Sequence, residues 1–141
     1  MSVSIKMDKK VIIAIIVVLL ALIGGYFLFK GNVQAPINAK EVIYTDSGYS
    51  PKEITIKIGD TVTWKNESSH GMWIASAMHP SHVIYSGTSL DEHCPDAQNT
   101  SFDECISAQP GESWSFKFDK QGTWRYHNHV QASDFGSIIV E

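Results

Sequence analysis

Cysteine is scarce in this 141-residue sequence, which contains only Cys94 and Cys105. Neither lies near the apolar segment at residues 11–29, so no thiol is available there to carry a lipid anchor. The two cysteines are eleven residues apart in an acidic, turn-rich region, and in an exported domain such a pair favours one disulfide. The alternative is a pair of metal thiolates, although the spacing differs from that of metal-knuckle motifs. We favour a Cys94–Cys105 disulfide that fixes a loop.

Positive charge is also scarce beyond the N-terminus. Residues 31–141 contain seven lysine and arginine residues against fourteen aspartate and glutamate residues, a formal charge of −7. Nucleic-acid phosphates would be repelled by such a surface, so nucleic acid is excluded as a partner. The charge suits cations and basic partners.

Charge is absent from residues 11–29, a run of nineteen residues. A helix of this length spans a bilayer core of about 30 Å. Lysines precede the run and acids dominate after it, which indicates a cytoplasmic basic tail at 1–10, a transmembrane anchor at 11–29, a linker at 30–40 and an extracytoplasmic domain at 41–141. A cleaved signal peptide is the rival interpretation, but its apolar region is typically shorter, about 7–15 residues. Under either interpretation the domain is exported, to the periplasm or the extracellular side.

Internal repeats are absent, and residues 41–141 show the two-residue alternation of β-strands. We expect about seven short strands, with residues 47–51 as a turn and the closing strand at residues 137–141, after Gly136. Residues 77–110 have little periodicity, and a loop of this length in a small domain is usually functional or tied down. Short strands separated by Gly and Pro turns predict an all-β, antiparallel sandwich or barrel.

The six histidines are unevenly placed. Five of them lie at expected strand ends or in the long loop, where a sandwich could gather them at one pole, and they form three groups: His70, then His79 with His82, then His127 with His129. The sixth, His93, precedes Cys94. Side chains two apart in a strand point the same way, so His127 and His129 can face one ion. We infer a metal site with His70, His127 and His129 as its first ligands and His79 and His82 completing or gating it.

Imidazole ligands suit copper, zinc, iron and nickel, and copper(II) binds most tightly in this series. Met72 and Met78 are adjacent to the histidine groups, and as ligands they would favour copper(I), but we expect them to serve packing instead. Because imidazole must lose its proton to bind, the affinity should fall as the pH drops through about 6.5.

Several motifs resemble those of the cupredoxins, the copper-binding sandwiches that include plastocyanins, amicyanins and the domains of multicopper oxidases. The first half of the resemblance is Tyr49-Ser50-Pro51, residues 54–66 and His70. The second half is residues 110–116, 122–127 and 136–140. The resemblance implies a cupredoxin-like Greek-key β-sandwich, here preceded by one N-terminal transmembrane helix, with copper as cofactor.

The sequence departs from the blue-copper cupredoxins at the ligand strand. The position that most simply matches their cysteine ligand is Asn128, and residues 133–135 replace the usual methionine region. Tyr126-His127-Asn128-His129 resembles instead the Tyr-His-x-His strand of the first domain of multicopper oxidases. A blue centre depends on a copper–thiolate bond, so we do not expect one here.

These observations favour a membrane-anchored copper-binding protein with a histidine-rich, non-blue mononuclear site, serving copper capture or delivery to an acceptor protein. One alternative is electron transfer with a redox partner. A second is a small copper-dependent oxidoreductase in which Asp134 or Tyr126 moves protons. A third is an interaction domain that has lost its metal, against which the retained histidines speak.

Overall fold

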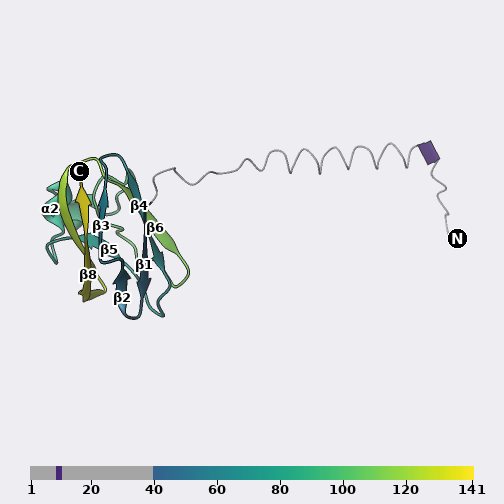
Figure 1. Ribbon diagram of the computed structural model, residues 1–141, viewed down its shortest axis with the longest axis horizontal. Coiled ribbons are helices and arrows are strands. Elements are labelled where there is room, and N and C mark those ends of the chain that lie inside the picture. Colours follow the sequence, from purple (N-terminus) through teal and green to yellow (C-terminus); the bar gives the residue numbers. More distant parts are fainter. Residues whose placement is uncertain (1–8, 11–39) are drawn as a thin grey trace. The chain divides into compact units, whose positions relative to one another are not determined.

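Two four-stranded sheets form a β-sandwich in the computed structural model, which describes residues 9–10 and 40–141 (Figure 1). The first sheet has the order β2 (Gly48–Ser50), β1 (Lys40–Thr45), β4 (Thr61–Asn66), β6 (Ser113–Lys117). The second has the order β3 (Glu53–Ile56), β8 (Gln131–Val140), β7 (Gly122–Asn128), β5 (Ile74–Ser76). The pairs β1–β4 and β3–β8 are parallel and the other pairs antiparallel. The predicted all-β sandwich is confirmed, with eight strands in the described part of the chain. Its sheets are not wholly antiparallel as expected, because β1 pairs with β4 and β3 with β8 across crossovers.

Two segments differ from the prediction. Residues 48–50 form β2 and not a turn, because the buried ring of Tyr49 packs against Tyr44 on β1, with ring centroids 4.6 Å apart. The last strand begins at Gln131, well before Gly136, because a tight turn after Asn128 sends the chain straight back along β7.

Aromatic side chains fill the space between the sheets. The fully buried ring of Trp64 lies 5.4–5.5 Å, between centroids, from the rings of Tyr126 and Phe102. Phe102 belongs to the long segment that follows β5, so this segment contributes to the core although it lacks strand periodicity.

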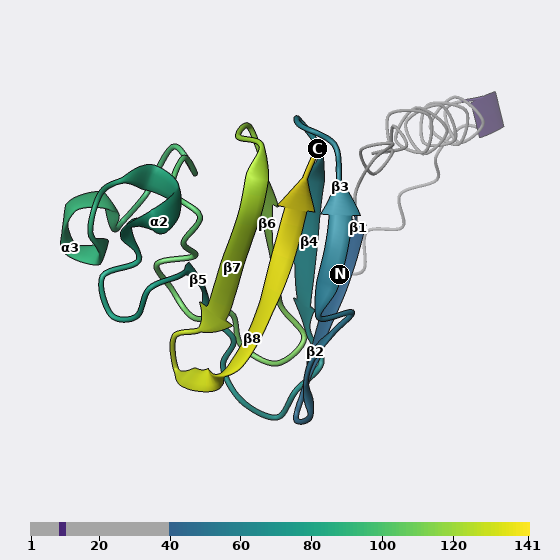
Figure 2. The same cartoon turned by 60° about the vertical axis from the view of Figure 1, so that its left-hand side comes forward.

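The long segment contains two short helices, α2 (Val83–Ser86) and α3 (Leu90–His93), which lie beyond the β5 side of the second sheet (Figure 2). A disulfide joins Cys94 and Cys105, as predicted. The backbone N–H of Ser76 donates to Phe102 O at 2.8 Å, which ties the segment to β5. The loop is therefore cross-linked within itself and bound to β5.

The predicted transmembrane anchor at 11–29 and most of the linker lie outside the described residues. Within residues 9–10 and 40–141, no helix has both the length and the apolar character needed to cross a membrane.

Candidate metal centre

Four histidine rings meet in one place: His79, His82, His127 and His129. Each offers one ring nitrogen, and these four nitrogens lie within 4.8 Å of one another. Nδ1 of His79 is 3.3 Å from Nε2 of His127, and Nδ1 of His129 is 3.0 Å from Nε2 of His82. We call this group the four-histidine cluster.

The cluster forms because β5 and β7 are neighbours. Ala75 on β5 pairs with His127 near the end of β7, and a bulge between His127 and Asn128 precedes the turn that carries His129. The chain leaves β5 at Ser76 and reaches His79 and His82 within six residues. Adjacent strand ends thus place the two histidine pairs opposite each other.

Asn128 and Trp73 fix the end of β7. The buried side chain of Asn128 accepts the backbone N–H groups of Trp73 at 2.9 Å and Val130 at 3.2 Å, and donates to Gly71 O at 3.1 Å. The Trp73 ring packs against His129, with centroids 4.4 Å apart. The position that most simply matches the cupredoxin cysteine is therefore occupied by a side chain that organises the turn.

Asp103 orients the His82 ring of the cluster. Its side chain is fully buried, and Oδ2 lies 2.5 Å from Nδ1 of His82. Oδ1 accepts the indole N–H of Trp73 at 2.7 Å and the backbone N–H of Cys105 at 2.9 Å. Because an ionised carboxylate only accepts hydrogen bonds, His82 donates through Nδ1 and its Nε2 lone pair faces the cluster.

Electrostatics keep these groups in the states that metal binding requires. Burial, with the neighbouring histidines adding to it, lowers the pKa of His127 to about 4. Burial followed by His82 and His79 also lowers the pKa of His129. Burial alone would raise the pKa of Asp103, but hydrogen bonds led by that of His82 outweigh it and the net pKa is lowered. At neutral pH the imidazoles of His127 and His129 are therefore neutral and the Asp103 carboxylate is ionised.

The nitrogen spacing fits a single transition-metal ion. With metal–nitrogen bonds of about 2.0–2.1 Å, nitrogens 3.0 and 3.3 Å apart subtend roughly 95–110° at the ion. These angles lie between square-planar and tetrahedral geometry, which suits copper in either oxidation state. Nε2 of His82, which faces Nδ1 of His129, carries a lone pair. The contact between these two nitrogens therefore needs either a proton or a metal cation between them.

His70, expected as a first ligand, is not brought into the cluster. Its Nδ1 lies 2.9 Å from Ser69 Oγ and its Nε2 3.5 Å from Asp46, and about half of its side chain is exposed. The physical reason lies in Asn66, which binds the His70 carbonyl at 2.8 Å and curls the chain after β4 toward Asp46. The centre is therefore built from two segments of the chain instead of three.

The other candidates are placed as follows. His93 does not join the cluster, and its Nε2 lies 3.3 Å from Asp103 Oδ2, the oxygen that also contacts His82 Nδ1. Met72 is a buried core residue, whereas Met78 is exposed next to His79. Tyr126 is also a core residue, and Asp134 accepts the hydroxyl of Tyr44 at 2.7 Å.

Sequence reasoning did not find Asp103. It lies in an acidic stretch of the aperiodic loop, and only its proximity to Cys105, which the disulfide anchors, could have drawn attention to it.

Comparison with known proteins shows the family to which the chain belongs. The model of the copper-binding proteins of the plastocyanin/azurin family matches residues 39–141, so the chain belongs to this cupredoxin family. Plastocyanin of Scenedesmus fuscus is 34% identical over 101 residues, covering 68% of this chain and 92% of that protein. Chloroplastic plastocyanin of Tetradesmus obliquus is 33% identical over 101 residues, covering 68% of this chain and 62% of its relative.

Solved cupredoxin structures share the fold. A purple cupredoxin from Nitrosopumilus maritimus superposes with a TM-score of 0.55 at 21% identity, over 72% of this chain and 99% of that one. An oxidised amicyanin variant gives a TM-score of 0.56 at 19% identity, over 77% and 87%. The family binds copper, and the four-histidine cluster is the candidate site for it in this chain.

Proposed function

We propose that this cupredoxin is a membrane-anchored, extracytoplasmic protein that binds one copper ion through the four-histidine cluster and serves copper capture and delivery. The observation that carries the proposal is the convergence of four ring nitrogens without a sulfur donor among them. Both cysteines are joined to each other in the disulfide, so neither supplies a thiolate to the cluster.

The uneven burial of the ligands supports an exchange role. His82 and His127 are buried, and Asp103 fixes the orientation of His82. His79 is exposed, so it is the ligand that solvent or an acceptor protein can reach first. A site with fixed inner ligands and one accessible ligand can take up copper and pass it on by stepwise exchange.

Electron transfer is the second candidate, because Asp103, Trp73 and Asn128 hold the ligands in a network that would limit rearrangement between copper(I) and copper(II). An oxidoreductase is a third. Rapid electron self-exchange of the copper-loaded protein would favour electron transfer, and copper-dependent turnover of a small molecule would favour catalysis.

Residues 11–29 provide the membrane anchor in this proposal, with the domain on the extracytoplasmic side. Alkaline washing of isolated membranes should leave the full chain in the membrane fraction and release a variant that lacks residues 1–30. Release of the full chain by the wash would contradict anchoring.

The site is tested by electron spin resonance of copper(II) bound to the full chain. We expect nitrogen hyperfine structure from imidazoles that changes in His127→Ala and His129→Ala, with copper affinity at least about 10-fold lower, since loss of even an outer-shell partner costs about 10–100-fold. His70→Ala is the matched control and should match wild type. Unchanged spectra in both His127→Ala and His129→Ala would contradict the proposed site.

A further inference from the structure

Asp103 also belongs to a second set of potential metal ligands. Nε2 of His93, the sulfurs of Cys94 and Cys105, and a carboxylate oxygen of Asp103 lie within 4.8 Å of one another. We propose that reduction of the Cys94–Cys105 disulfide converts this set into a second metal site, for a thiophilic divalent cation of the zinc class. The proposal does not depend on the function assigned to the four-histidine cluster.

The geometry suits a tetrahedral ion. His93 Nε2 is 3.3 Å from Asp103 Oδ2, which is about the edge of a tetrahedron with metal–ligand distances near 2.0–2.1 Å. The Cα atoms of the two cysteines are 5.5 Å apart, so two sulfurs at bonds of about 2.3 Å could reach one ion after small side-chain rotations. Two cysteines, one histidine and one carboxylate form a donor set typical of zinc.

The four ligands are held by contacts other than the disulfide. The backbone N–H of Cys94 donates to Leu90 O at 3.0 Å, which closes α3, and that of Cys105 donates to Asp103 Oδ1 at 2.9 Å. The N–H of Glu104 donates to Ile74 O at 2.8 Å on β5. These bonds remain when the sulfurs separate.

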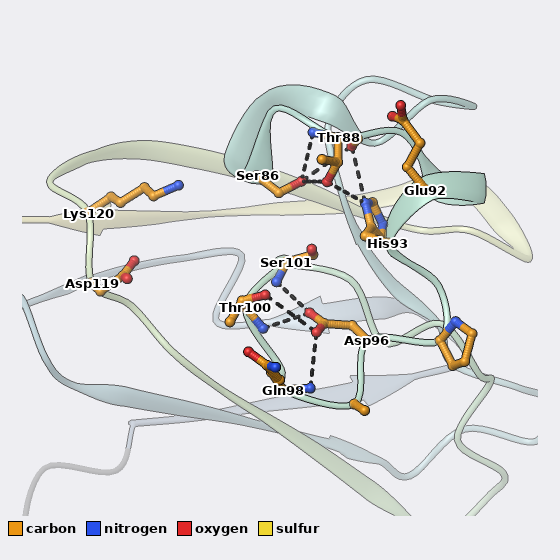
Figure 3. Close-up of a pocket in the computed structure, with 12 residues that line it drawn as sticks. Ser86, Thr88, Glu92, His93, Asp96, Gln98, Thr100, Ser101, Asp119 and Lys120 are labelled. Carbon is orange, nitrogen blue, oxygen red and sulfur yellow. Dashed lines mark hydrogen bonds between the residues drawn. The ribbon is translucent and has the colours of Figure 1, made fainter.

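The ring of His93 already points a ligand atom at the site. Nδ1 lies 3.1 Å from the Thr88 carbonyl and 3.2 Å from the Thr88 hydroxyl, and these contacts hold the ring with Nε2 turned toward Asp103. Nε2 lies beside the ionised Asp103 carboxylate, which only accepts hydrogen bonds, so a cation bound there would replace the proton between the two groups. Figure 3 shows His93 beside Thr88 at the wall of an open cavity that Asp96 and Ser101 also line.

The chemistry is a reversible two-electron step. A dithiol reductant transfers two electrons and two protons to the disulfide, the S–S bond breaks, and the reductant becomes a disulfide itself. The cation then replaces the two thiol protons. Oxidation by a disulfide restores the S–S bond and releases the ion, so the site exists only in the reduced protein.

Asp103 couples the two sites. The oxygen that would bind the second ion is Oδ2, the same atom that orients His82. A cation there draws negative charge away from His82, so each ion should weaken binding of the other by the same factor. This coupling alone rests on the proposed copper site.

The test is a cobalt(II) titration of the full chain, oxidised and phosphine-reduced. We expect thiolate-to-cobalt charge-transfer absorption in the reduced protein only, absent from Cys94→Ser/Cys105→Ser. His93→Ala, which keeps its disulfide so that its folding can be checked in the oxidised form, should bind at least about 10-fold more weakly. His70→Ala is the control and should match wild type.

No thiolate band in the reduced wild type would overturn the proposal, as would a band of equal affinity in His93→Ala. If the four-histidine cluster fails to bind copper, the thiolate band of the reduced protein should still appear. Failure of the proposed function can therefore be told apart from failure of this second site. Addition of zinc should also slow alkylation of the reduced thiols.

Discussion

At the scale of single residues, Asp103 has the largest part in orienting the candidate centre. It is fully buried, and its ionised carboxylate is stabilised by hydrogen bonds from a histidine, a tryptophan and a backbone N–H. Its bond to His82 selects the ring tautomer whose free lone pair faces the cluster. A buried charge of this kind is costly unless its partners are all in place, which is why the loop that carries it must be rigid.

Replacing this carboxylate by an amide should disturb the site without removing a ligand. In Asp103→Asn the side-chain NH₂ would donate to His82 Nδ1, so His82 would carry its proton on Nε2, toward the cluster. We expect copper affinity to fall about 10–100-fold, measured by competition with a chelator. Asp134→Asn is the control, because Asp134 contacts Tyr44 and not the cluster. Equal affinities for the two variants would show that Asp103 does not set the tautomer.

At the scale of elements, the β7–β8 hairpin delivers the ligand pair, and Gly136 makes the hairpin possible. Tyr126 on β7 pairs with Gly136 on β8, and its ring crosses over the glycine. A Cβ atom at Gly136 would lie 2.4 Å from Tyr126 Oη and 2.8 Å from the Lys52 carbonyl. The strand can pass the buried tyrosine only because this residue has no side chain.

We therefore expect Gly136→Ala to lower the free energy of unfolding by roughly 1–3 kcal/mol or more through overpacking. The contrasting variant is Gly59→Ala, at a left-handed residue with open space around its Cβ, for which strain of about 1 kcal/mol is expected. Urea denaturation measures both values. A larger loss for Gly59→Ala would contradict the packing argument.

At the scale of the whole molecule, two titratable groups that are wholly or partly buried limit the pH range in which the fold is stable. Burial raises the pKa of Glu104 from 4.5 to about 8, so its stabilising contribution is complete below pH 4.5 and is lost as the pH rises through 8. The pKa of His127 is lowered from 6.5 to about 4, so its contribution is present above pH 6.5 and is lost as the pH falls through 4. The metal-free protein should be most stable between these limits.

Glu104→Gln isolates the alkaline side of this profile. The glutamine oxygen can still accept the N–H of Ile74, as Glu104 does at 2.9 Å, but it cannot ionise. We expect the variant to gain stability relative to wild type between pH 5 and pH 8.5, measured by urea denaturation of the metal-free protein. A difference between the two proteins that stays constant with pH would contradict the raised pKa.

Much of the sandwich could be predicted because its strands alternate clearly. Ile54 and Ile56, and Trp114 and Phe116, lie on β3 and β6 as their spacing indicates. Strand β2 could not be predicted, because three residues carry no period and their pairing depends on a tertiary contact between Tyr44 and Tyr49.

The site was predictable only in part. His127 and His129 follow from the alternation of β7, and His79 and His82 from their spacing, and the structure brings all four together. The expectation that His70 shares the centre is not met, because the turn after β4 is set by Asn66 binding backbone groups, which sequence spacing does not show. Asp103 depends on contacts across the aperiodic loop and carries no local signal.

The central claim is that copper in this cupredoxin is bound by imidazole nitrogens and not by sulfur. X-ray absorption at the copper edge of the oxidised, copper-loaded full chain tests it most directly. The account predicts a first shell of three to four nitrogens at about 2.0 Å, with the outer-shell scattering of imidazole rings. A sulfur scatterer at about 2.3 Å would contradict it.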